Sequence, residues 1–207
     1  MPTALTDRRR DPAATRATIL DAAEELFIAK GFADTSVSQV ARLARVTKSL
    51  IHHHFGSKEE LWTEVKRRAF QEYFDVQHDM LGREGDSGAI LGESLITYFD
   101  FLAKNPKTSR LLSWVYLEED EDCDDLVEDL LRLGIEKITE GQARGLIRQD
   151  VAPASILVSF LALVEHWFLT KGRSCRTFLD GRGGEAELEA AYREDVIKIF
   201  LKGVLPG

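Results

Sequence analysis

The sequence predicts an all-α protein built from two helical domains, and three observations support this fold class. Apolar residues recur three and four positions apart along most of the 207 residues, which is the spacing of a buried helix face. Runs of alternating β-branched residues, which are typical of strands, do not occur, and clusters of Gly and Pro are few. Finally, two stretches open with Ser followed three residues later by Gln or Glu, a pattern that caps helix N-termini.

The first expected helix covers residues 12–30. Asp11 is a suitable capping residue, and Pro12 is tolerated in the first turn, where its missing N–H costs no hydrogen bond. Gly31 follows as a stop signal. The apolar face of this helix is formed by Ile19, Ala23, Leu26 and Phe27.

Two short helices are expected next. Ser36 and Gln39 form a capping box at the start of a helix at about 36–44, and Thr47 can cap another at 47–54. The apolar stripe of the first is Val37, Val40, Ala41 and Ala44. The second is expected to turn Leu50, Ile51, His54 and Phe55 inward.

A second capping box, Ser57 with Glu60, predicts a longer helix over 57–81. Beyond it the chain is expected to form a separate, larger helical body. The helices predicted there are 88–104, 106–118, 123–148, 153–171 and 185–203. The segment 172–184, which is rich in Gly, is predicted to be a loop.

Charge is unevenly distributed along the chain, whose formal net charge is −8. Residues 1–58 hold nine Lys and Arg against six Asp and Glu, whereas the remainder holds 18 against 29. A basic N-terminal quarter on an acidic body is the pattern expected when one end of a protein meets a polyanion.

Composition and targeting signals favour a soluble cytoplasmic protein. Hydrophobic residues at 44% and charged residues at 30% are typical of a globular chain, and the N-terminus has no apolar run of the signal-peptide kind. The longest apolar run, 151–164, stops at Glu165 and is too short to cross a bilayer, so no membrane contact is expected. Cys123 and Cys175 form no C-x-x-C pair, which argues against a disulfide framework or a structural zinc site, although redox sensing stays an alternative.

Two short helices joined by a tight turn, with a further helix behind them, are typical of a helix-turn-helix motif. The second helix of such a motif must enter a DNA major groove about 12 Å wide. It therefore has to be short, polar on its outer face and firmly backed by apolar contacts. The segment 47–54 meets these needs, because it leaves Thr47, Lys48, Ser49, His52 and His53 facing outward.

The segment "TRATILDAAEELFIAKGFADTSVSQVARLARVTKSLIHHHFGSKEELW" resembles the N-terminal domain of the TetR (tetracycline-repressor) family of transcriptional regulators. The resemblance extends over about 48 residues. It is carried by IL-x-AA-x-x-LF, the Gly of KGF, T-S-V, V-T-K and the ending HHF-x-SKE-x-L. The helical remainder is consistent with the variable C-terminal domain of that family.

The resemblance implies a domain organisation and a function. We expect a flexible basic arm at 1–14, a DNA-binding domain at 15–58 with its motif at about 36–55, and a ligand-binding and dimerisation domain at 59–207. The implied function is a homodimeric, sequence-specific regulator, a repressor that a small molecule releases from a palindromic double-stranded operator. An activator of the same family is the alternative.

Two residues depart from the pattern of the family. The turn usually carries Gly where this chain has Arg45, and a left-handed residue other than Gly costs about 1 kcal/mol there. The usual Tyr of the recognition helix is His52 here, which leaves the base preference open.

Position within the family pattern assigns the residues expected to contact DNA. Lys48 is expected to reach a phosphate or a base edge, and Lys58 to hold a phosphate. Thr35 and Ser36 offer hydroxyl or N–H groups, with simple helix capping as the alternative. The full set is Thr35, Ser36, Arg45, Thr47, Lys48, Ser49, His52, His53 and Lys58. The arm at 7–10 is a weaker candidate for the minor groove.

The run His52–His54 also raises the alternative of a metal-dependent protein or enzyme, together with the acidic run 118–125. Adjacent helical residues point about 100° apart and cannot converge on one ion, since ligand pairs need a spacing of three or four. The acidic run is better explained as a solvated loop. With no phosphate-binding loop, nucleophile elbow or zinc-protease motif in the sequence, we expect no metal, no cofactor and no catalysis.

The resemblance further implies a ligand pocket and a dimer interface in the C-terminal body. Polar-tipped and aromatic residues of the middle helices are the pocket candidates: Tyr98, Phe101, Trp114, Tyr116, His166 and Trp167. Broad apolar faces on the last two helices predict an interface made by Phe160, Val164, Trp167, Leu188, Tyr192, Val196, Ile199 and Phe200. The alternative is that these residues belong to the core of a single chain.

Overall fold

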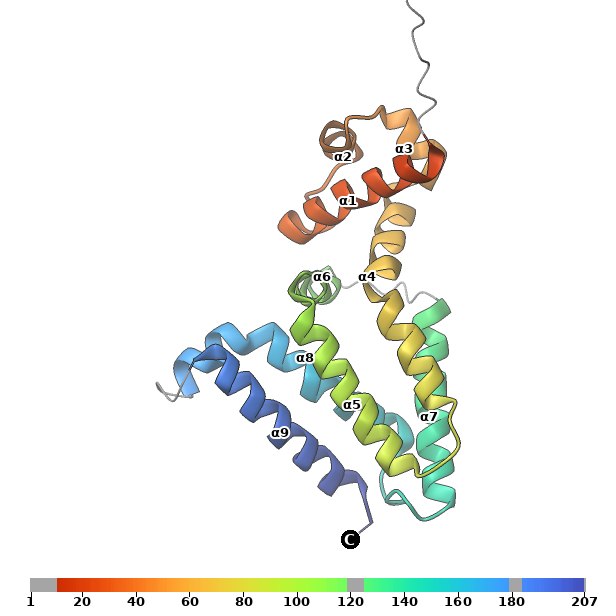
Figure 1. Cartoon of the computed structure of the whole chain (residues 1–207), viewed down its shortest axis with the longest axis vertical. Coiled ribbons are helices and arrows are strands. Elements are labelled where there is room, and N and C mark those ends of the chain that lie inside the picture. The colour runs from red at the N-terminus through yellow and green to blue at the C-terminus, as the bar shows by residue number, and fades with distance from the viewer. Residues whose placement is uncertain (1–10, 119–124, 179–183, 207) are drawn as a thin grey trace, which may run out of the picture. The chain divides into compact units, whose positions relative to one another are not determined.

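The computed structural model describes residues 11–118, 125–178 and 184–206. Within these ranges the chain forms helices and no strand, which confirms the predicted all-α class (Figure 1). The helices are α1 Pro12–Lys30, α2 Val37–Ala44, α3 Lys48–Phe55, α4 Lys58–Leu81, α5 Ser87–Lys104, α6 Pro106–Leu117, α7 Asp125–Ala143, α8 Pro153–Phe178 and α9 Glu185–Val204.

The chain divides into two compact units, and α4 and α6 contribute to both. Among the described residues, the first unit holds 11–69 and 114–118, and the second holds the rest. The first unit thus extends beyond residue 58, where the sequence analysis places the domain boundary. The reason is that the first turns of α4 bury Leu61 and Trp62, and Trp62 meets the ring of Phe27 edge-on at 4.9 Å.

In the first unit, α1 is fastened to the side of α4 by apolar contacts and ion pairs. Ile19 and Phe27 of α1 are completely buried. On the surface, Arg68 of α4 pairs with Asp21 at 2.8 Å and also with Glu24. Because these pairs are partly exposed, packing rather than charge supplies most of the stabilisation.

The turn between α1 and α2 is held by the end of α6. The indole Nε1 of Trp114 donates to the carbonyl oxygen of Ile28 at 3.0 Å, and the backbone N–H of Ala33 donates to Glu118 at 3.1 Å. Gly31, in the same turn, has φ 80° and ψ 179°, a conformation that is essentially restricted to Gly. A Cβ at this position would lie 2.6 Å from the ring of Trp114.

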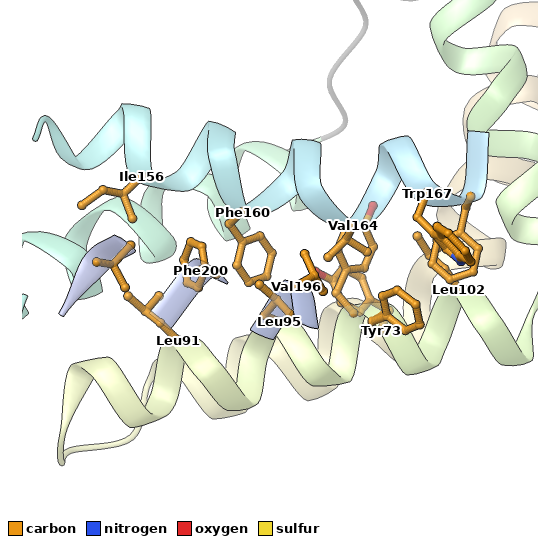
Figure 2. Close-up of a cluster of buried hydrophobic side chains, with 14 of the residues drawn as sticks. Tyr73, Leu91, Leu95, Leu102, Ile156, Phe160, Val164, Trp167, Val196 and Phe200 are labelled. Atoms are coloured by element: carbon orange, nitrogen blue, oxygen red, sulfur yellow. The ribbon is translucent and has the colours of Figure 1, made fainter. Parts of the chain in front are cut away.

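The core of the second unit is formed mainly by α4, α5, α7, α8 and α9, with Leu112 of α6. Figure 2 shows Leu91 and Leu95 of α5 facing Phe160 and Val164 of α8, with Phe200 of α9 beside them. At the surface, Arg193 of α9 holds Asp100 of α5 through two hydrogen bonds of 2.5 and 2.9 Å.

This core corrects the predicted dimer interface. Five of the eight residues assigned to it are at most 4% exposed within a single chain, and a surface that is already covered cannot be shared with a partner. These five are Phe160, Val164, Trp167, Val196 and Phe200. Leu188 and Tyr192 are half-buried, with Tyr192 stacked on Trp167 at 4.3 Å. Ile199 alone of the eight is exposed, at 63%.

Two helix ends differ from the prediction. Helix α7 stops at Ala143 instead of 148, because the side chain of Gln142 donates to the carbonyl oxygens of Arg148 and Val151 and closes a loop there. Helix α8 continues to Phe178, through much of the predicted loop, since one Gly within a helix weakens it without stopping it.

Some predicted features lie outside the described residues. These are residues 1–10 of the arm predicted at 1–14, most of the acidic run, Cys123 and residues 179–183 of the predicted loop; the side chain of Cys175 is also not described. Residues 12–14 of that arm belong to α1 instead. The residues Pro153–Gly172 are apolar and long enough to cross a membrane by composition. In the structure, however, they supply Ile156, Phe160 and other core residues to the second unit.

We predict that Gly31→Ala lowers the free energy of unfolding by at least about 3 kcal/mol, because backbone strain adds to overlap with Trp114. Gly145→Ala is a matched control. Gly145 also has a positive φ, 70°, but nothing lies within 4 Å of an added Cβ, so strain alone of about 1 kcal/mol is expected. Urea unfolding followed by circular dichroism measures both, and equal losses would contradict the crowding by Trp114.

Candidate nucleic-acid interface and ligand cavity

Helices α2 and α3 both begin at side-chain caps. The hydroxyl of Ser36 accepts from the backbone N–H of Gln39 at 3.3 Å, while the side chain of Gln39 accepts from the N–H of Ser36 at 2.7 Å. The predicted capping box is therefore confirmed. The hydroxyl of Thr47 accepts from the N–H of Leu50 at 3.3 Å, which confirms its role as the cap of α3.

The turn between α2 and α3 is closed by Arg45 in the left-handed conformation, with φ 55° and ψ 45°. Its N–H donates to the carbonyl oxygen of Arg42 at 3.3 Å, and the N–H of Val46 donates to that of Ala41 at 3.0 Å. This pair of hydrogen bonds is the Schellman arrangement, which normally uses Gly. In the described part of the chain, Arg45 has a positive φ and the other residues with a positive φ are all Gly.

Helix α3 has one buried side and one exposed side, as expected of a recognition helix. Ile51 and Phe55 are buried, and Leu50 and His54 are half-buried. The exposed side carries the polar residues that the sequence analysis assigns to DNA, namely Thr47, Lys48, Ser49, His52 and His53. The geometry thus brings this part of the predicted set onto one continuous surface.

The three histidines of α3 do different things. Nδ1 of His52 lies 2.7 Å from the carbonyl oxygen of Gly56, and because a carbonyl only accepts, Nδ1 is the donor. In the neutral ring Nε2 is then an acceptor, which suits an amino group on a base edge, and only the protonated ring can donate from Nε2 to a phosphate. His53 is exposed, and the ring of His54 lies between those of His53 and Phe55, at 5.5 and 6.2 Å.

The two lysines of the predicted set differ in how firmly they are held. Lys48 is exposed and makes no hydrogen bond or ion pair with another residue of the described ranges. The ammonium of Lys58 lies 4.0 Å from the ring centroid of Phe32 and 3.5 Å from the carbonyl oxygen of Ala33. A fixed charge of this kind suits a phosphate contact, since little side-chain entropy remains to be lost on binding.

Thr35 does not belong to this surface, and its assignment to DNA is wrong. Its side chain is 2% exposed, and its hydroxyl donates to the carbonyl oxygen of Gly31 at 2.7 Å. Its backbone N–H is also engaged, with the carbonyl oxygen of Phe32 at 3.2 Å. Thr35 therefore stabilises the turn before α2, whereas Ser36 next to it is exposed.

The six predicted pocket residues do not surround one cavity. Tyr98 and Phe101 stack on Tyr73 at 4.7 and 5.2 Å between ring centroids. Trp167 is buried against Tyr192. The remaining three lie elsewhere: Trp114 belongs to the first unit, and Tyr116 and His166 are exposed.

The second unit does contain a cavity, of about 40 Å³, and none of the six predicted pocket residues lines it. Its wall comes from α4, α5, α7, α8 and α9. Among the described residues that line it, ten are apolar or Gly and three are polar but uncharged, namely Tyr73, Gln77 and Ser94. The available signal was Gln77, a polar residue one turn after Tyr73 on the same face of α4.

Comparisons with known proteins give two family models along the chain. The model of bacterial regulatory proteins, tetR family, matches residues 19–65. The model of the tetracyclin repressor-like C-terminal domain matches residues 94–197.

Individual proteins are similar over most of the chain. The HTH-type transcriptional repressor SCO4008 of Streptomyces coelicolor is 29% identical over 177 residues, which are 83% of this chain and 87% of the relative. The HTH-type transcriptional repressor NicS of Pseudomonas putida is 26% identical over 196 residues, 92% of each chain. The crystal structure of NalD, a repressor of a multidrug efflux pump in Pseudomonas aeruginosa, has the same fold, with a TM-score of 0.67 at 23% identity over 94% of this chain and 98% of that one.

We predict that Arg45→Gly raises the free energy of unfolding by about 1 kcal/mol, because Gly adopts the left-handed turn without strain. At the same time it should weaken DNA binding through loss of a cation. Arg45→Ala is the control, since it removes the same side chain but keeps the strain. Both variants should lose DNA affinity equally, measured by fluorescence anisotropy, while only the Gly variant gains stability. A loss of stability in Arg45→Gly would contradict the strained turn.

Proposed function

This chain belongs to the TetR family of bacterial transcriptional regulators, and from that premise we propose that it represses transcription by occupying a near-palindromic operator until a small molecule releases it. It is a DNA-binding transcription factor and not an enzyme. The names of SCO4008 and NicS as repressors support repression rather than activation. The cytoplasm is the expected location, because the operator lies there.

The observation that carries this proposal is the exposed polar side of α3, set on a capped and buried support. In a symmetric dimer, two such helices enter successive major grooves of the operator with centres about 34–36 Å apart. Lys48 and Lys58 then neutralise phosphates, and Ser49, His52 and His53 face base edges. Thr47 and the N-terminus of α3 offer N–H groups to a further phosphate.

The homodimer is expected to use the exposed side of α8 and α9 in place of the buried residues. Val158, Ala162 and Leu169 of α8 are exposed at helical spacing, and Ile199 of α9 is exposed as well. Exposed apolar side chains gathered on two adjacent helices are typical of a surface that a partner covers. Two copies related by a two-fold axis would bury them in a four-helix interface.

Release by a ligand follows from differential binding. A small molecule that binds better to a conformation with a different spacing of the two α3 helices lowers the affinity for DNA. Helices α4 and α6 are suited to transmit such a change because each contributes residues to both units. The end of α6 holds the α1–α2 turn through Trp114 and Glu118, so a shift of α6 acts directly on the support of α2.

The test begins with genomic DNA fragments that the purified protein retains at moderate salt. With one such fragment, the logarithm of affinity against the logarithm of salt concentration gives a slope. We predict that Lys48→Ala and Lys58→Ala each reduce this slope by about 0.9, the value for one phosphate contact. Lys107→Ala, an exposed lysine of the second unit, makes the same change in net charge and should leave the slope unaltered.

Unchanged slopes in both variants would remove these lysines from the phosphate contacts. Retention of no specific fragment would contradict the proposed function altogether. Transcription from a template that carries the retained fragment then separates repression from activation, because the protein should reduce the transcript in the first case.

We also predict that Val158→Asp and Ile199→Asp dissociate the dimer, because each buries a carboxylate in an apolar interface. Sedimentation should give the monomer mass of 23.3 kDa for the variants and twice that mass for the unaltered protein. Val76→Asp, on α4, changes a Val that is 43% exposed and serves as the control that stays dimeric. If the α8 and α9 variants also stay dimeric, the interface lies elsewhere.

A further inference from the structure

The cavity of the second unit has a wall that is unusually uniform in chemistry. Leucines of α4, α5, α7 and α8 make up most of it, together with Phe160 and Phe200. No charged side chain lies among the described residues of the wall. An ion placed here would lose its hydration without gaining an opposite charge, which costs several kcal/mol.

One end of the cavity is polar. Gln77, which is 1% exposed, donates through Nε2 to the carbonyl oxygen of Ser94 at 2.9 Å, and the hydroxyl of Ser94 donates to Oε1 of Gln77 at 2.6 Å. Tyr73 also lines the cavity, one turn before Gln77 on α4. Gln77 and Ser94 thus bond to each other and still retain lone pairs and an amide hydrogen for a guest.

The surroundings of this polar end further disfavour an anion. Burial raises the pKa of Tyr73, and the negative charge of Glu165 raises it more, so the phenol stays neutral at all physiological pH values. Glu165 itself is buried and accepts a hydrogen bond of 2.6 Å from the hydroxyl of Tyr98. A carboxylate or phosphate at Gln77 would meet this negative potential in a medium that screens it poorly.

The size of the cavity restricts the shape of its occupant. About 40 Å³ holds a water molecule or two, so a larger guest must displace side chains. Leu130 and Leu131 of α7 and Leu157 and Leu161 of α8 are half-buried and form the exposed margin of the cavity. Gly134 of α7 belongs to the same wall, and a Cβ added to it would lie 3.2 Å from Leu157 of α8. Helices α7 and α8 therefore approach each other at a position where α7 has no side chain. Rotation of leucines opens room for a slim chain more readily than for a rigid ring system.

We propose that the effector is a neutral, slender aliphatic molecule with a single hydrogen-bonding group, such as an alcohol, ketone or ester, which lies in this cavity with that group against Gln77 and Ser94. The inference rests on the proposed function in one respect, that ligand binding releases DNA. The chemical class itself follows from the wall of the cavity and the charge near its polar end, and does not depend on DNA binding.

The test uses three probes of equal length: 1-octanol, octanoate and octylamine at pH 7.5. Isothermal titration of the full-length protein without DNA should give an affinity for octanol at least tenfold higher than for either charged probe. Octanoate or octylamine binding as tightly as octanol would overturn the inference, and so would the absence of octanol binding. This comparison needs no variant, so it does not depend on the folding of one.

Two variants then locate the binding. Gln77→Leu keeps the approximate size of the side chain but removes its polar group. It should lower the affinity for octanol about fivefold, which corresponds to the loss of one hydrogen bond. Gly134→Val fills the space between α7 and α8 and should abolish binding. Both should retain the helical circular dichroism of the unaltered protein. Unchanged octanol affinity in both folded variants would mean that octanol binds elsewhere and would overturn the site.

DNA retention is measured separately, so the two proposals can fail independently. If the protein retains specific fragments but prefers a charged probe, the ligand class is wrong and the regulator stands. If octanol binds in the cavity but saturating octanol leaves retention unchanged, its role as an effector is overturned. Release of the fragment by octanol, and not by octanoate, supports both.

Discussion

Burial of Ile51 and Phe55 is what holds α3 in a single orientation, and DNA recognition depends on that support. The helix has eight residues, and isolated helices shorter than about 12–15 residues are marginal in water. Its direction is therefore imposed by its apolar side and its caps. Arg16 of α1 strengthens the support, because its guanidinium lies 4.9 Å above the ring of Phe55 while it pairs with Glu64 of α4. One side chain thus joins three helices around the recognition surface.

The same support explains why a strained residue is tolerated in the turn. Arg45 is left-handed because α2 and α3 must both bury their apolar sides within the first unit, and this packing sets the backbone angles of the turn between them. The strain of about 1 kcal/mol is small beside the burial of Val40, Ile51 and Phe55, each of which contributes roughly 1.5–3 kcal/mol. A cation at this place in the turn is then available for DNA, which a Gly would not provide.

Features encoded locally were predictable from the sequence, and features decided by tertiary packing were not. The bounds of α1 and the caps Ser36 and Thr47 follow from neighbouring residues, and the structure agrees with them. From its position in the sequence, Thr35 is expected to be exposed at the start of α2. In the structure its hydroxyl instead donates to the carbonyl oxygen of Gly31, four residues earlier, inside the turn. Phe160 and Val196 are apolar at helical spacing, but periodicity cannot tell whether the same chain or a partner covers such a face. Gln77 was missed for the same reason, because its burial depends on α5.

The small volume of the cavity bears on how the proposed ligand would control DNA binding. An effector shifts an equilibrium only by the difference between its affinities for the two states, and a change from 1:99 to 99:1 needs roughly a ten-thousand-fold difference. A large pocket would bind the ligand in both states, and most of its binding free energy would then not shift the equilibrium between them. Under our proposal, a cavity of about 40 Å³ admits the ligand only when its leucine side chains move, so nearly all of the binding free energy would favour the conformation that accommodates the ligand. If the ligand binds there as we propose, tight packing around Gln77 and Ser94 would weaken its absolute affinity but strengthen its effect on operator binding.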